Sequence, residues 1–243
     1  MTSHYWAYRN ADKNKSDDKK TVPLYLFFSG SGTGKSRNAR ELHHLALRCF
    51  NGEFGEKVDE IASCLTSPYV FHVSLENGTS LTGNETSWEG IGTRMLCQLV
   101  RKDDGKLMSI AELNKLFIPP TPEEVIFCLE QGTLDTLRGK AFILVVDGLR
   151  MLNQGIVNGS PRRDLDDIVT RLGNLAHAFL YSYGGFFIVC GTSTISGGAV
   201  SKALKASQRW RVYLPCEPID RPKDANGNNV FTYGNMLEDG CFD

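Results

Sequence analysis

The sequence contains no long apolar run and no marked excess of either charge. Its apolar stretches fall far short of the ~20 residues that a membrane-spanning helix needs, and its first 20 residues lack the apolar segment of a secretion signal. The 27 basic and 28 acidic side chains give a net charge of −1, which favours neither nucleic acid nor an anionic membrane as a partner. We therefore expect no membrane association and no direct nucleic-acid binding by this domain.

The seven cysteines contain no C-x-x-C pair and are odd in number. A zinc site or a disulfide framework normally shows such a pair or an even set of cysteines. Cys128 and Cys190 lie inside apolar runs, so we expect reduced and mostly buried thiols. This cysteine usage predicts that the folded protein works in an intracellular, reducing compartment.

The most informative segment runs from residue 23 to residue 50. An apolar strand at 24–28 is followed by the string SGSGTGKS at 29–36 and then by apolar residues at helical spacing. A strand, a glycine-rich turn ending in Gly-Lys-Ser and a helix are the context of a phosphate-binding loop. Its glycines let successive N–H groups point at phosphate oxygens, and the helix start adds its positive dipole end. The predicted nucleotide-binding residues of this segment are Gly30, Ser31, Gly32, Thr33, Gly34, Lys35, Ser36 and Arg37.

Two side chains of this loop are expected to carry the chemistry. Lys35 would neutralise the β- and γ-phosphates, and the Ser36 hydroxyl would ligate Mg²⁺. Ser29 stands where the usual pattern has its first glycine. If that position requires a left-handed backbone, serine costs about 1 kcal/mol there. The alternative is a glycine-rich turn that binds nothing.

Strands and helices alternate along the rest of the chain. Further strands are expected at 69–75, 141–147, from 186, and at 211–215. Helices are expected around 58–65, 91–101, 121–137 and 165–179. Fully apolar strands separated by helices predict an α/β fold with a parallel sheet of about five strands and helices on both faces. Ligands of such sheets bind at the carboxyl ends of the strands, where the loop, Glu76, Asp147 and 192–194 would converge.

Asp147 ends an apolar strand about a hundred residues after the loop. We expect it to support the Mg²⁺ ion together with Ser36; the alternative is an aspartate that caps a turn with Gly148. Many ATPases of this class carry an acid directly after that aspartate, and here Gly148 takes its place. Glu76, which follows the second strand, is the candidate replacement as the base that orients water. The alternative for Glu76 is a solvated turn residue.

The remaining polar positions carry weaker patterns. Thr192 and Ser193 end the strand from 186, where a polar residue can contact the γ-phosphate; the alternative is a turn. Arg209 or Arg211 could supply a positive charge to a phosphate in the same subunit or in a neighbour of a nucleotide-dependent homo-oligomer, although such arginines are more often structural. The adjacent pair His43–His44 is poorly suited to metal binding because neighbouring helical side chains diverge.

Five strings of the sequence recur together in a known family. They are LFFSGSGTGKSRNARELHH, FHVSLENGTSL, IGTRMLCQLV, VVDG and FFIVCGTS, which span roughly residues 21–215. On these strings the chain resembles the P-loop NTPase module of the Crinkler (CRN) and retrotransposon-hot-spot proteins. The resemblance implies a divergent STAND/AAA-like ATPase of the ASCE class. In Crinklers it also implies a secreted effector of oomycetes or fungi that is delivered to the host cytoplasm and nucleus, with a host protein as partner.

The same resemblance sets the expected domain boundaries. We expect neither a ubiquitin-like header before the first strand nor a nuclease-like or kinase-like domain after residue 220, which leaves open a fragment, a truncated product or a stand-alone module. We predict a flexible lead-in at 1–20, a P-loop NTPase domain at 21–218, and a tail or the start of a further domain at 219–243.

The leading interpretation is an enzyme that binds and hydrolyses ATP with Mg²⁺. ATP is favoured over GTP because no guanine-reading N-K-x-D string follows the loop. Lys35, Asp147 and Glu76 are the predicted catalytic residues. The alternative is a nucleotide-gated switch or scaffold that binds ATP with little turnover and acts through a partner, which Ser29 and Gly148 favour. A third interpretation is a structural domain that binds no nucleotide.

Overall fold

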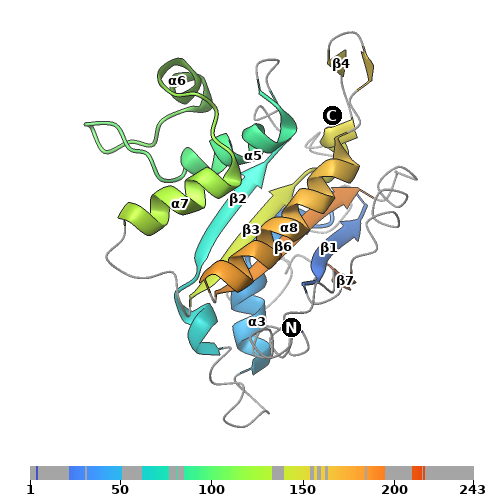
Figure 1. Cartoon of the computed structure of the whole chain (residues 1–243). Helices are drawn as coiled ribbons and strands as arrows, with labels where there is room; N and C mark the ends of the chain where they lie inside the picture. The colour runs from blue at the N-terminus through green and yellow to red at the C-terminus, as the bar shows by residue number, and fades with distance from the viewer. Residues whose placement is uncertain are drawn as a thin grey trace, which may run out of the picture.

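A five-stranded parallel sheet forms the centre of the computed structural model, in the order β2-β3-β6-β1-β7 (Figure 1). The structure describes residue 4 and residues 22–30, 32–50, 62–76, 81, 85–132, 140–153, 156–157, 160–161, 164–183, 185–194, 210–214 and 216. The strands of the sheet are β1 (Leu24–Ser29), β2 (Tyr69–Ser74), β3 (Ala141–Asp147), β6 (Phe186–Thr194) and β7 (Arg211–Leu214). The predicted α/β fold with a parallel sheet of about five strands is confirmed.

All pairings in this sheet are parallel, so the strands end at the same edge. β1 lies between β6 and β7, with Ser29 opposite Thr194. β3 lies between β2 and β6, with Asp147 opposite Ser74. Neighbours that are not consecutive in the chain require crossover connections. The result is one edge that gathers the carboxyl ends of strands far apart in the sequence.

Helices cover both faces of the sheet. They are α2 (Lys35–Arg40), α3 (Leu42–Phe50), α5 (Ser87–Leu96), α6 (Ile110–Leu116), α7 (Pro122–Gly132) and α8 (Leu165–Tyr183), with a short 3-10 helix η1 (Leu149–Asn153). In Figure 1, α8 crosses in front of β3 and β6, whereas α3 lies behind the sheet. The described residues 62–66 are also helical, where the sequence predicts a short helical patch.

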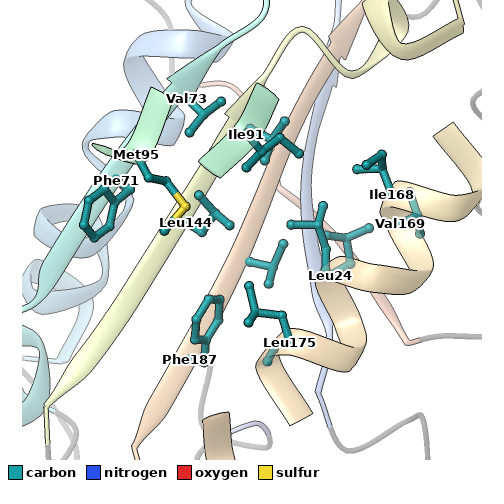
Figure 2. Close-up of a cluster of buried hydrophobic side chains, with 14 of the residues drawn as sticks. Leu24, Phe71, Val73, Ile91, Met95, Leu144, Ile168, Val169, Leu175 and Phe187 are labelled. Atoms are coloured by element: carbon teal, nitrogen blue, oxygen red, sulfur yellow. The ribbon is translucent and has the colours of Figure 1, made fainter. Parts of the chain in front are cut away.

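Two hydrophobic cores hold these layers together, one on each face of the sheet. On the larger, strand residues such as Phe71 and Leu144 meet Ile91 and Met95 of α5 and Ile168 of α8 (Figure 2). The smaller core packs α2 and α3 against the other face and includes Ala39 and Leu42. Burying apolar surface on both faces is the reason that β3 is buried along its entire length.

Three helices (α5, α6 and α7) begin at capping boxes, and the sequence predicted only the start of α7. At α7, Thr121 N–H donates to Glu124 Oε2 at 2.7 Å, and Glu124 N–H donates to Thr121 Oγ1 at 3.4 Å, which confirms the helix start expected near residue 121. Capping boxes Thr86/Glu89 and Ser109/Glu112 start α5 and α6. As a result α5 begins earlier than its apolar period indicates, and α6 is a helix that the sequence analysis did not predict.

Other differences from the predicted elements are local. The helix after the loop is divided at Glu41 into α2 and α3. A short antiparallel pair, β4 (Ile156–Val157) and β5 (Ser160–Pro161), lies between η1 and α8, where the sequence analysis predicts no strand. The end predicted for α7 falls on residues 133–137, outside the described residues.

The expected burial of most thiols is wrong for the described cysteines. Cys128 is exposed, Cys190 is buried, and Cys64, Cys97 and Cys216 are half-buried. The reason at Cys128 is the orientation of α7, which turns Val125 and Ile126 toward the core and leaves the following residues on its outer face.

Gly92 marks the closest approach between α5 and α7. A Cβ atom at this position would lie 2.1 Å from the carbonyl oxygen of Pro120 and 2.6 Å from the carbonyl carbon of Thr121. Both are backbone atoms directly before α7. The absence of a side chain at Gly92 therefore sets how closely the two helices pack.

Gln98, just after α5, contacts the backbone of strand β2. Its Oε1 accepts a hydrogen bond from His72 N–H at 3.1 Å, and its Nε2 donates to the His72 carbonyl at 3.3 Å. The same Nε2 also donates to the carbonyl of Arg94 at 2.8 Å. One side chain thus joins β2 to the last turn of α5.

Within the described residues, no helix combines the length and apolarity needed to cross a membrane.

Candidate nucleotide-binding site

A pocket of about 330 Å³ opens at the carboxyl edge of the sheet. It is lined by Gly32, Gly34, Lys35, Ser36, Arg37, Glu76, Asp147, Gly148, Arg150, Thr192, Ser193 and Thr194. The volume lies within the range of small-molecule sites. The structure thus brings together, at one pocket, the glycine loop, Glu76, Asp147 and the end of β6, as the strand order requires.

The glycine loop joins β1 to α2 in a tight turn. Gly32 and Gly34 adopt left-handed backbone angles, with φ of 73° and 81°, which glycine tolerates without strain. The carbonyl of Gly30 accepts hydrogen bonds from Thr33 Oγ1 at 2.9 Å and from Lys35 Nζ. Ser31 lies outside the described residues. The ammonium group of Lys35 therefore rests on its own loop, within reach of the pocket that it lines.

Ser29 carries no backbone strain. It is the last residue of β1 and pairs with Thr194 in extended conformation, so the left-handed angles of the turn begin after it. The expected cost of a left-handed serine does not arise, and one of the two features that favoured a poorly active loop is removed.

Ser36 and Asp147 meet at the wall of the pocket although 111 residues separate them. Ser36 Oγ donates a hydrogen bond to Asp147 Oδ1 at 2.8 Å. Thr192 Oγ1 donates to the same carboxylate oxygen and accepts from Gly148 N–H at 3.1 Å. Thr192 lines the pocket, and its hydroxyl links Asp147 to the backbone of the residue after it. The largely buried Asp147 is held in one orientation by two hydroxyl groups.

The oxygens of Ser36 and Asp147 form a donor set suited to Mg²⁺. This ion prefers oxygen ligands and is usually bound by one or two protein groups together with substrate phosphates and water. A group of three or more His, Cys, Asp or Glu side chains able to hold a metal is absent from the described part of the chain. The residues present fit Mg²⁺ that arrives with a nucleotide better than a metal held by protein ligands alone.

Two titratable groups near this pair are held in their neutral forms. Burial lowers the pKa of His72 on β2, and the positive charge of Arg40 lowers it further. Burial also raises the pKa of the Cys190 thiol, and the nearby Asp147 carboxylate adds to the shift. Neither side chain therefore contributes a charge beside Asp147 near pH 7.

Glu76 and Arg150 form an ion pair at the pocket, with Arg150 Nε donating to Glu76 Oε1 at 2.9 Å. Gly148 lies beneath this pair with φ of 86°. A Cβ atom at Gly148 would lie 2.6 Å from Cγ of Glu76. The Glu76 side chain thus occupies the space into which an acidic residue at position 148 would project. Sequence reasoning missed Arg150; its place three residues after Asp147, on the turn leaving β3, was the signal available.

The other predicted residues lie in different places. Arg37 and Ser193 line the pocket. Arg211 pairs with Leu24 at the amino end of β1, the end away from the loop, and does not line its own pocket. Arg209 lies outside the described residues. The rings of His43 and His44 lie with centroids 3.8 Å apart.

The parallel sheet, the glycine loop between β1 and α2, and the hydrogen-bonded pair Ser36–Asp147 define a P-loop NTPase-like fold. No protein-family profile matches the chain. Crinkler effector protein 108 of Phytophthora sojae is 30% identical over 217 residues, which cover 84% of this chain and 24% of that protein. The chain is a relative of the Crinkler effectors, and the predicted resemblance is confirmed. It spans about a quarter of that protein's length.

Two solved structures share weaker similarity. The ORC1 protein of Aeropyrum pernix, in complex with DNA, matches with a TM-score of 0.40 and 19% identity, over 97% of this chain and 47% of that one. The Drosophila ORC bound to DNA matches with a TM-score of 0.34 and 14% identity, over 87% of this chain and 41% of that one.

Proposed function

We propose that this chain binds ATP together with Mg²⁺ and hydrolyses it. The main observation behind the proposal is the hydrogen bond from Ser36 Oγ to Asp147 Oδ1, which lies in the same pocket as Lys35. A hydroxyl and a carboxylate at that spacing, beside an ammonium group and left-handed glycines, suit a triphosphate with its metal. A structural turn requires none of these groups to converge.

Each group has one role in this proposal. The loop N–H groups and Lys35 bind the phosphates, and Arg37 extends the positive wall of the pocket. Ser36 and Asp147 would hold Mg²⁺, which supplies charge neutralisation for the phosphate oxygens when bound. Thr192 keeps the Asp147 carboxylate oriented toward Ser36. ATP is preferred to GTP because the sequence lacks an N-K-x-D string after the loop.

Glu76 is the proposed base for hydrolysis. A water oxygen attacks the γ-phosphorus, the bond to the bridging oxygen of ADP breaks, and the proton of the water passes to the Glu76 carboxylate before it reaches solvent. Glu76 lines the pocket, and Gly148 leaves room for it where the usual acid is missing.

We expect Glu76→Gln to lower ATP turnover about 100-fold, because an amide cannot accept the proton. ATP affinity should be retained or modestly increased, because the substitution removes a negative charge from the phosphate pocket. Phosphate release and equilibrium binding of labelled ATP check both parts. Glu130→Gln, on α7 and outside the pocket lining, is the matched control. Turnover equal to that of the unmodified protein would exclude Glu76 as the base, and a protein that binds no ATP would contradict the function itself.

A second candidate is a nucleotide-gated switch with little turnover. The ion pair between Glu76 and Arg150 favours it, because the guanidinium takes up a carboxylate oxygen that would otherwise face the attacking water. Tight ATP binding with turnover no faster than that of Glu76→Gln would establish the switch in place of the enzyme.

We also propose that the chain acts inside host cells, as part of an effector. This rests on the similarity to a protein named as a Crinkler effector. A fluorescent fusion of the chain expressed in host cells is expected to fill the cytoplasm and nucleus. Retention of a folded fusion outside both compartments would contradict this proposal without bearing on ATP binding.

A further inference from the structure

The pocket contains a cation that does not belong to the glycine loop or to helix α2. Arg150 lies on η1, and its half-exposed side chain lines the pocket together with Lys35 and Arg37. Its Nε bonds to Glu76. Among the described residues, its two terminal amino groups have no hydrogen-bond partner. A guanidinium has five N–H donors arranged in a planar fork, so most of the donors of Arg150 are available to a ligand.

We propose that Arg150 binds the terminal phosphate of the nucleotide and that this contact frees Glu76 to act on water. The inference rests on the ATP function proposed above and deepens it. It makes Arg150 the residue that distinguishes a triphosphate from a diphosphate. It also makes the Glu76–Arg150 ion pair the resting state of the base, present until a γ-phosphate arrives.

The ion pair is suited to such an exchange because it is not sealed from water. The side chains of Arg150 and Glu76 are 42% and 28% exposed, and ion pairs this accessible are held only weakly. A terminal phosphate carries more negative charge than one carboxylate and matches the guanidinium fork in two-point geometry. We therefore expect a terminal phosphate to displace Glu76 from the guanidinium, and a diphosphate, which lacks that group, to leave the ion pair in place.

The backbone that carries Arg150 is fixed, so the side chain alone has to move. Its neighbours Leu149 and Leu152 are fully buried. Met151 N–H donates to the Gly148 carbonyl at 2.9 Å, which closes the turn directly after Asp147. Leu149 also packs against Gly191, where an added Cβ would lie 2.5 Å from its Cδ1. A guanidinium on such a rigid support keeps a constant distance from the metal-binding pair.

The test compares ATP and ADP affinities with turnover in Arg150→Gln, Arg150→Lys and the control Arg101→Gln. Arg101 is an exposed arginine outside the pocket that bonds to the Gly105 carbonyl. We expect Arg150→Gln to weaken ATP binding about tenfold or more, the loss of one charge-assisted contact, with ADP affinity unchanged. Arg150→Lys should recover part of the ATP affinity, and Arg101→Gln should match the unmodified protein. Turnover should fall in both Arg150 variants.

The ratio of ATP to ADP affinity separates this role from a structural one, since a loosened fold would weaken both nucleotides together. An unmodified protein that prefers ATP, combined with an unchanged ratio in Arg150→Gln, overturns the role of Arg150 and leaves the ATP function standing. An unmodified protein that binds neither nucleotide overturns both proposals. A ratio that falls in Arg150→Gln while Glu76→Gln binds ATP at least as tightly as the unmodified protein supports the exchange.

Discussion

Replacing Gly148 with glutamate is expected to lower ATP turnover about 100-fold or more, although it restores the acid that many related ATPases carry at this position. Two features of the structure oppose the new side chain. Gly148 has φ of 86°, where an L-residue is strained by about 1–2 kcal/mol. Its Cβ would also lie 2.6 Å from Glu76 Cγ, so the added residue displaces the carboxylate that we propose as the base.

The strain at this position also reaches Ser36 and Asp147, the pair that we propose to hold Mg²⁺. Gly148 N–H donates to Thr192 Oγ1, and that hydroxyl donates to Asp147. A backbone that relaxes away from φ of 86° withdraws this N–H and releases Thr192, and Asp147 then loses one of the two hydroxyls that orient it. The expected effect of Gly148→Glu therefore combines displacement of the proposed base, Glu76, with a disturbed orientation of the proposed metal ligand, Asp147.

Phosphate release and ATP binding measured on Gly148→Glu and Gly148→Ala check this expectation. Alanine adds the Cβ without the acid, so both variants should lose turnover, and glutamate should not recover what alanine loses. If Gly148→Glu instead turns over faster than the unmodified protein, position 148 is the natural place of the base and Glu76 has another role.

Gly92→Ala is expected to destabilise the fold by about 3 kcal/mol, near the upper end of the cost of overpacking. The atom in the way is the Pro120 carbonyl oxygen, 2.1 Å from the added Cβ. It belongs to the backbone before α7, which the Thr121–Glu124 cap and the buried residues Val125 and Ile126 fix in place. Relief of the contact requires α5 and α7 to separate.

Gly90→Ala, two residues earlier on the same helix, is the matched control. Its added Cβ would lie 2.2 Å from Leu81 Cδ2, the far end of a side chain that can change rotamer. Both substitutions gain about 1 kcal/mol of helix propensity, so Gly90→Ala should remain within about 1 kcal/mol of the unmodified protein. Urea unfolding of the two variants measures the difference. Equal stabilities would show that the backbone before α7 yields to an added side chain at Gly92.

The sequence predicted the parts of the site that depend on local chemistry. The loop could be predicted because a strand, glycines at fixed offsets and a Lys-Ser pair follow one another directly in the sequence. The position of Asp147 beside the loop could be predicted because six apolar residues precede it, and parallel strands bring their carboxyl ends to one edge of the sheet. In the structure, these two segments meet through Ser36 Oγ and Asp147 Oδ1.

The parts that the sequence did not predict depend on contacts between segments. Gly148 alone indicates a missing acid, and only its backbone angle together with the place of Glu76 explains why glycine is required there. Arg150 has no motif, and its link to Glu76 spans 74 positions of the chain. Helix α6 is short, so its apolar period is too brief to detect. The capping box Ser109/Glu112 is the one sequence feature that indicates it.

The contact of Gln98 with His72 has a consequence for assembly. β2 is a terminal strand of the described sheet, and terminal strands offer unpaired backbone groups that recruit strands from other chains. The Gln98 side chain forms hydrogen bonds with both the N–H and the carbonyl of His72, at the middle of β2. A sixth strand would pair with the same backbone groups. A foreign strand could dock there only by first displacing this amide and loosening the end of α5. We therefore do not expect larger complexes built on this domain to lengthen the sheet past β2.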